Sequence, residues 1–132
     1  MQINLPDVLA EVSAAFARYE TALVTNDTAT LDELFRTADE TVRFGIGENL
    51  FGIEEIRNFR NNRRAINLAR DIARTSITTY GRDFATTAIT FHRASAPGKT
   101  GRQMQSWVRF PEGWRIVAAH VSLIPTPEDE PQ

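Results

Sequence analysis

Four runs with strand character follow one another in the second half of the chain. They read DIARTSITTYG, DFATTAITFHRA, GRQMQSWVRF and EGWRIVAAHVSLI, and β-branched and aromatic residues occur throughout them. Only the short stretches GR, SAPGKT and PE separate these runs. The second half of the chain is therefore predicted to form a meander of long antiparallel strands.

The first half of the chain is predicted to be mainly helical. From Pro6 to about Thr25 apolar side chains recur every three or four residues, which is typical of a long amphipathic helix. The segment TNDT supplies a break and an N-cap, and LDELF continues as a short second helix that ends near Arg36. TVRFGIGENLFG then predicts a strand, a turn and a second extended piece, and IEEIRNFRNNRR predicts a third helix.

Helices gathered early and strands gathered late predict an α+β fold, in which helices cover one face of a bent sheet. A chain of 132 residues has the size of one domain, which we place at residues 1–125. Residues 126–132 are acidic and rich in proline, so we expect them to form a solvated tail.

The composition argues against several classes of function. With 15 basic and 17 acidic side chains the chain has no excess of positive charge, so nucleic acid is not an expected partner. No apolar stretch approaches the roughly 20 residues that cross a bilayer, and no signal peptide is evident, so we expect a cytoplasmic protein. The chain has no cysteine, two histidines and no motif for nucleotides or a nucleophilic serine, so we expect neither a metal nor a cofactor.

Polar groups at positions that should be buried are the candidates for a functional site, because a buried group without a partner costs about 1–3 kcal/mol. Tyr19 falls on the apolar stripe of the first helix and is either a core tyrosine or a cavity residue. Arg43 lies in a short strand and, taken alone, is expected to point to solvent. Arg60 and Arg63 share a helix face with apolar residues, so each needs a carboxylate, an anion or a route to water.

The last two strand runs offer further polar side chains. Alternation along them predicts two shared faces, one with Gln103, Gln105, Trp107 and Arg109 and the other with Ile116, Ala118, His120 and Ser122. His120 is either a hydrogen-bonded core histidine or part of a cavity wall. Together these groups predict a cavity that selects a small carboxylated substrate, because guanidinium groups bind carboxylates in a bidentate manner. Gln105, Trp107, His120 and Ser122 are accordingly predicted to contact that substrate with Arg60 and Arg63.

The order of the elements resembles the nuclear transport factor 2-like (SnoaL-like) superfamily, whose curved sheet and helices enclose a conical pocket. The closing stretch GRQMQSWVRFPEGWRIVAAHVSLIP is similar to the AtzH-like family, also called HpxZ-like or DUF3225. The segments RYETALVTND and VRFGIGENLFGIEEIRNFRNNR look like other characteristic segments of that family. The resemblance implies a single cone-shaped domain with a curved antiparallel sheet wrapped around the N-terminal helices.

The same resemblance implies a function in ureide or s-triazine nitrogen catabolism. It suggests a metal-free decarboxylating amidohydrolase that acts on a carboxylated urea, such as 1,3-dicarboxyurea, or on a related oxalurate-type ureido acid. The functional tyrosine and arginine of the family match Tyr19 and Arg43, and this match favours an inward orientation for both. In this interpretation Arg60 or Arg63 helps Arg43 to anchor a carboxylate, and His120 orients a ligand or a water.

Two other functions and one assembly state are compatible with the same sequence. A non-catalytic ligand-binding or accessory protein of an amidase pathway would use the same arginines without turnover. A cone-fold isomerase would need a carboxylate base in the pocket, and the sequence predicts few inward carboxylates. Exposed sheets in such folds commonly pair, so a homodimer is expected.

Overall fold

The computed structural model of the chain describes residues 1–64 and 66–128. The helices are α1 (Pro6–Val24), α2 (Thr28–Leu34) and α3 (Ile53–Asn62), and the strands are β1 (Val42–Phe44), β2 (Asn49–Phe51), β3 (Asp71–Tyr80), β4 (Phe84–His92), β5 (Lys99–Phe110) and β6 (Gly113–Pro125). Each predicted helix and strand run is present. The local periodicity of the sequence was therefore sufficient to identify the elements.

The strands form one sheet in the order β2-β1-β6-β5-β4-β3. Strands β3 to β6 form the predicted antiparallel meander. One strand pair of the sheet is parallel, because β1 runs in the same direction as β6 and sets Val42 opposite Ala118. No hairpin connects these two strands, since most of the chain lies between them, and so no tight turn imposes an antiparallel direction on them.

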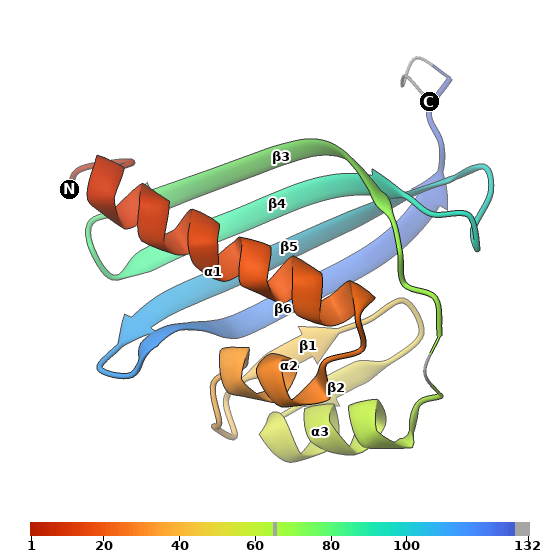
Figure 1. Cartoon of the computed structure of the whole chain (residues 1–132), viewed down its shortest axis with the longest axis horizontal. Coiled ribbons are helices and arrows are strands. Elements are labelled where there is room, and N and C mark those ends of the chain that lie inside the picture. Colours follow the sequence, from red (N-terminus) through yellow and green to blue (C-terminus); the bar gives the residue numbers. More distant parts are fainter. Residues whose placement is uncertain (65, 129–132) are drawn as a thin grey trace.

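All three helices lie on one face of the sheet, which we call the inner face (Figure 1). Helix α1 crosses the long strands, and α2 and α3 gather near the short β1–β2 hairpin. Alternate residues of β4 and β5 are buried between the sheet and the helices, with Phe91 and Trp107 fully enclosed. The opposite, outer face of the sheet carries no helix in the described part of the chain.

A β-bulge in β6 changes which of its residues face inward. Trp107 of β5 pairs with Ile116, whereas the preceding Ser106 pairs with Ala118, so Val117 is an extra residue. Beyond the bulge Ala119 packs against the core and Ala118 is exposed. The predicted shared face of Ile116 with Ala118, His120 and Ser122 is therefore wrong, because one extra residue reverses the alternation.

The chain that enters the second helix is held by local hydrogen bonds. Asn26 adopts a left-handed backbone conformation with φ 56°, and Asp27 follows as the N-cap of α2. The Asp27 carboxylate accepts a hydrogen bond from the Thr30 amide at 3.1 Å. The predicted break and cap in TNDT are confirmed.

In the described ranges no helix combines the length and the hydropathy that crossing a membrane requires. The expected tail, residues 126–132, lies partly outside the described residues, which end at 128. Its first residue is held to the β4–β5 connection, since the Thr126 amide donates to the Gly98 carbonyl at 2.9 Å.

Candidate functional site

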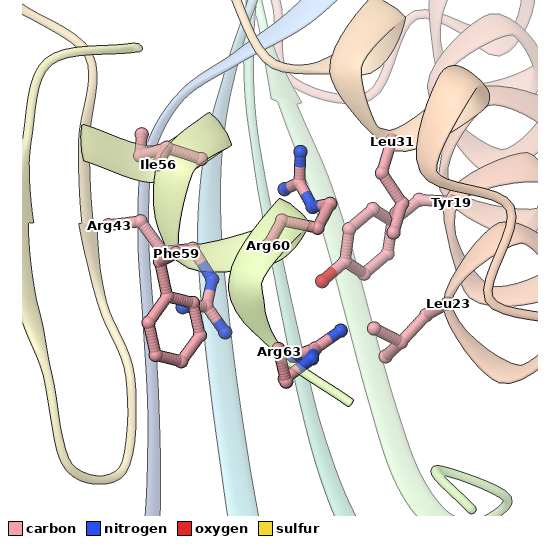
Figure 2. Close-up of a pocket in the computed structure, with 8 residues that line it drawn as sticks. All are labelled: Tyr19, Leu23, Leu31, Arg43, Ile56, Phe59, Arg60 and Arg63. Carbon is pink, nitrogen blue, oxygen red and sulfur yellow. The ribbon is translucent and has the colours of Figure 1, made fainter. Parts of the chain in front are cut away.

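Four predicted site residues meet in a hollow between α1, α3 and the β1 end of the sheet. Tyr19 comes from α1, Arg43 from β1, Arg60 from α3 and Arg63 from the end of α3. Figure 2 shows the Tyr19 hydroxyl directed into the space between Arg60 and Arg63. Leu23, Leu31, Ile56 and Phe59 form the apolar part of the wall.

Tyr19 is 5% exposed, and its ring packs edge-on against Phe35 with 6.3 Å between the ring centroids. Its hydroxyl has no hydrogen-bond partner among the residues that the structure describes. The ring is buried, but the hydroxyl oxygen is accessible at the hollow and is not a buried group without a partner. The phenol is therefore available to a bound molecule.

Arg43 lies on the inner face of the sheet, so the outward orientation expected from its strand alone is wrong. It pairs in register with the buried Leu50 of β2, and α3 covers this part of the sheet. Its Nη1 donates to the Glu48 carboxylate at 2.9 Å. The other Glu48 oxygen accepts a hydrogen bond from the Gly47 amide at 3.1 Å. Glu48 is therefore the carboxylate that lines the wider part of the hollow among the described residues.

Arg60 is buried and does not extend along the helix to water. Its guanidinium forms an ion pair with Asp32 of α2 and lies 5.2 Å from the centroid of the Phe35 ring. Burial lowers the pKa of Arg60 from its ordinary value, and the Asp32 carboxylate opposes that effect. Arg60 therefore lines the hollow beside Tyr19 with its charge neutralised by Asp32.

Arg63 has a different electrostatic environment. It is the C-cap residue of α3, and its guanidinium lies 5.9 Å from the centroid of the Phe59 ring. Burial lowers the pKa of Arg63, and the positive charge of Arg43 acts in the same direction. Within the described residues no carboxylate forms an ion pair with Arg63 and no hydrogen bond holds it. Among these residues Arg63 therefore has no direct ion pair, and the Glu48 carboxylate opposes the lowering of its pKa only from a distance.

The hollow widens past Tyr19 into a cavity of about 180 Å³. Its wall includes Arg70, which is bound through two nitrogens to Glu20 at 2.6 and 3.2 Å and donates to the Gln103 side chain at 3.1 Å. The Arg70 guanidinium also lies 4.4 Å from the centroid of the Phe91 ring. These contacts fix Arg70 in place and neutralise it.

Two of the predicted substrate-binding residues lie in the core. Trp107 is fully buried, and its indole N–H donates to the Thr87 hydroxyl at 3.1 Å. That hydroxyl donates to the Gln105 side-chain oxygen at 3.0 Å. Neither Gln105 nor Trp107 lines the hollow around Tyr19. They face inward as predicted, but the helices cover them.

The other two predicted substrate-binding residues lie on the outer face of the sheet. The His120 ring packs edge-on against Phe44, with 6.0 Å between centroids. The Ser122 hydroxyl accepts hydrogen bonds from the Arg102 guanidinium at 3.1 and 3.2 Å. The bulge at Val117 turns both side chains away from Tyr19, so neither one lines the hollow.

Three charged residues of the hollow were missed by the sequence analysis: Glu48, Arg70 and Arg93. Arg93 carried a usable signal, because it lies two residues after Phe91 and so continues the inner face of β4. Arg70 precedes β3 in a connection without a periodic pattern, and Glu48 lies in a hairpin turn. Nothing in the local sequence identified either of them.

Over the described ranges, no group of three or more His, Cys, Asp or Glu side chains comes together that could hold a metal ion. The hollow instead offers guanidinium groups and one phenol. This donor set suits anions, since guanidinium N–H groups bind carboxylates through charge-assisted hydrogen bonds.

The chain shares its fold with several solved structures. A DUF3225 family protein of unknown function from Pectobacterium atrosepticum is 59% identical, with a TM-score of 0.90 over 92% of this chain and 94% of that one. A cystatin-like fold protein from Burkholderia xenovorans is 48% identical, with a TM-score of 0.92 over 96% and 99%. A nuclear transport factor 2-like superfamily protein from Salmonella enterica is 25% identical, with a TM-score of 0.72 over 96% and 98%. No curated protein matches the chain at a significant level.

A comparison of the sequence with protein-family profiles also identifies a family. The AtzH-like profile matches residues 1–127, which is nearly the whole chain. The structural neighbours confirm the cone-shaped α+β architecture that the resemblance implied. The chain belongs to the AtzH-like family and has the nuclear transport factor 2-like fold.

Proposed function

We propose that this protein is a decarboxylating amidohydrolase of ureide or s-triazine nitrogen catabolism. Its substrate is a carboxylated urea such as 1,3-dicarboxyurea, or an oxalurate-type ureido acid. The proposal is supported by membership of the AtzH-like family, whose name points to a triazine pathway. The observation that carries it is the Tyr19 hydroxyl, which has no partner among the described residues and lies beside Arg63, a cation that no carboxylate of these residues contacts directly.

In this proposal the arginines bind the anion and Tyr19 supplies a proton. Arg63, with Arg43, holds a substrate carboxylate near the phenol. The bond between the carboxylate carbon and the urea nitrogen breaks, and its electron pair stays on nitrogen. The nitrogen takes the Tyr19 proton as carbon dioxide leaves, and the tyrosinate regains a proton from water.

The surrounding charges favour that proton transfer. Arg60 and Arg63 both lie close enough to Tyr19 to interact with it electrostatically. The positive charge of Arg63, which no carboxylate in the described part of the chain contacts directly, stabilises the phenolate that forms when Tyr19 gives up its proton. For hydrolysis of the remaining amide, Glu48 is the lining carboxylate that can accept a proton from water.

The test of the proposal is Tyr19→Phe. The change removes the hydroxyl and keeps the ring against Phe35, so it should abolish turnover with an unchanged melting temperature. Activity is measured as carbon dioxide and ammonia released from freshly prepared 1,3-dicarboxyurea. The matched control is Tyr80→Phe on β3, the other tyrosine of the chain, which packs on Phe84 and lies outside the hollow.

Full activity of the Tyr19→Phe variant would contradict the proposed role of Tyr19 as the proton donor. Calorimetric binding of the ureido acid by the wild-type protein without any product would instead identify a ligand-binding or accessory protein. Loss of activity in both tyrosine variants would mean that the change acts on the fold and not on the chemistry.

A further inference from the structure

A second arginine without a partner lines the same hollow as Tyr19. Arg93 directly follows β4, two residues after Phe91, and the side chains of both line the cavity. The Arg93 Nε is buried and has no hydrogen-bond partner. Throughout the described part of the chain no carboxylate forms an ion pair with Arg93. Nothing in the predicted site or in the proposed mechanism uses this residue.

Two of the cations around the hollow have no direct ion pair in the described part of the chain. Four arginines and one glutamate line the wider part: Arg43, Arg63, Arg70, Arg93 and Glu48. Glu48 neutralises Arg43, and Glu20 neutralises Arg70. Arg63 and Arg93 remain, on different elements, one at the end of α3 and the other after β4.

Two unpaired guanidinium groups around one small cavity need an explanation. A buried N–H without a partner costs free energy, and two like charges around one space repel each other. A ligand with a single carboxylate compensates only one of them. A ligand with a carboxylate at each end compensates both, and it fits a cavity whose lining is otherwise largely apolar.

We infer that Arg93 is a specificity-determining residue that binds the second carboxylate of a dianionic substrate, while the first carboxylate lies at Arg63 beside Tyr19. This inference rests on the proposed function and names the substrate class more closely. It selects a urea carboxylated at both ends over an oxalurate-type ureido acid, which carries one carboxylate.

The inference can be tested with inert ligands, independently of turnover. Glutarate has three atoms between its carboxylates, as 1,3-dicarboxyurea does, and it does not lose carbon dioxide. Glutaramate has the same length but carries a neutral amide in place of one carboxylate. The difference in affinity between the two ligands therefore reports the binding of the second carboxylate.

Titration calorimetry should show that the wild-type protein binds glutarate at least about tenfold more tightly than glutaramate. In Arg93→Gln the affinity for glutarate should fall at least about tenfold, and the affinity for glutaramate should change less than about twofold. Arg93→Lys, which keeps the charge, should recover part of the glutarate affinity. The matched control Arg102→Gln, on the outer face beside Ser122, should change neither affinity.

The inference is overturned if the wild-type protein does not prefer glutarate, or if Arg93→Gln weakens both ligands equally. It is also overturned if Arg93→Gln binds glutarate as the wild-type protein does. If glutarate binding depends on Arg93 but wild-type protein releases no carbon dioxide from 1,3-dicarboxyurea, the dianion site stands and the proposed activity fails. The two failures are thus distinguishable.

Discussion

The arginines around the hollow differ in whether they form an ion pair with a carboxylate. Arg43 pairs with Glu48, Arg60 pairs with Asp32 and Arg70 pairs with Glu20. Arg63 and Arg93 have no carboxylate partner in the described part of the chain. A residue type that looks uniform in the sequence therefore divides into arginines with an ion pair and arginines without one.

The pair between Arg60 and Asp32 should contribute strongly to stability. Asp32→Asn removes the negative charge that compensates a buried guanidinium, so the free energy of unfolding should fall by about 1–3 kcal/mol in urea denaturation. The control is Glu33→Gln, because Glu33 pairs with Arg18 at the surface, where an ion pair contributes at most about 1 kcal/mol. Equal losses in the two variants would show that Asp32 does not compensate a buried charge.

At the scale of elements, the wall of the hollow depends on the fit between β4 and β5. Gly101 of β5 lies opposite Phe91 of β4, and a Cβ at Gly101 would lie 2.2 Å from the nearest ring carbon. The absent side chain lets the Phe91 ring lie across the strand, where Arg70 stacks on it. A single glycine therefore positions an aromatic ring and an arginine of the cavity wall.

Gly101→Ala should destabilise the protein by about 1–3 kcal/mol, because the new methyl group overlaps a fully buried ring. Thermal and urea denaturation measure the effect. Adding Phe91→Leu should recover part of the loss by making room. Gly47→Ala is the control, since nothing lies within 4 Å of a Cβ at that position. A Gly101→Ala variant as stable as the wild-type protein would contradict this account.

The bulge in β6 changes the direction in which the following side chains of the strand point. Next to the bulge, the Ile116 carbonyl accepts a hydrogen bond from the Arg36 amide at 2.9 Å. This bond holds the chain that follows α2 against the sheet. The bulge also directs His120 and Ser122 to the outer face. A sequence argument based on strict alternation predicts the wrong face after any such insertion.

On the scale of the whole molecule, the outer face of the sheet carries an apolar surface. We define the outer-face patch as Val42, Phe44, Phe51, Met104 and His120. Met104 is 59% exposed and Phe51 is 58% exposed, and Phe44 packs against both Phe51 and His120. Exposed apolar side chains that cluster on one face are typical of protein interfaces. We propose that two copies of the chain associate through this patch as a homodimer.

Met104→Asp places a charge at a strongly exposed member of the patch, so the dimer should dissociate. Size-exclusion chromatography with light scattering should give the mass of two chains for the wild-type protein and of one chain for the variant. The circular dichroism spectrum should stay unchanged. Val24→Asp is the control, because Val24 is an exposed apolar residue at the end of α1, outside the patch. A dimeric Met104→Asp variant would place the interface elsewhere.

Much of the fold could be predicted from local sequence. The helical stripe through Tyr19, the cap at Asp27 and the four strand runs all appear in the structure where the pattern puts them. Of the candidate site residues, Tyr19, Arg60 and Arg63 were on faces that the pattern marked as buried, and the family resemblance supplied the inward orientation of Arg43. These are local properties, because periodicity and capping act over a few neighbouring residues.

By itself the sequence determined the elements, their order and the phenol and arginines that could form an anion site. Only the tertiary structure decided three features. These are the parallel pairing of β1 with β6, the side of the sheet on which His120 lies, and which carboxylate pairs with which arginine. The ion pair of Arg70 with Glu20 joins residues 50 positions apart, and that of Arg60 with Asp32 joins residues 28 apart. Such pairs depend on how distant segments pack, so no local pattern specifies which arginines form an ion pair and which do not.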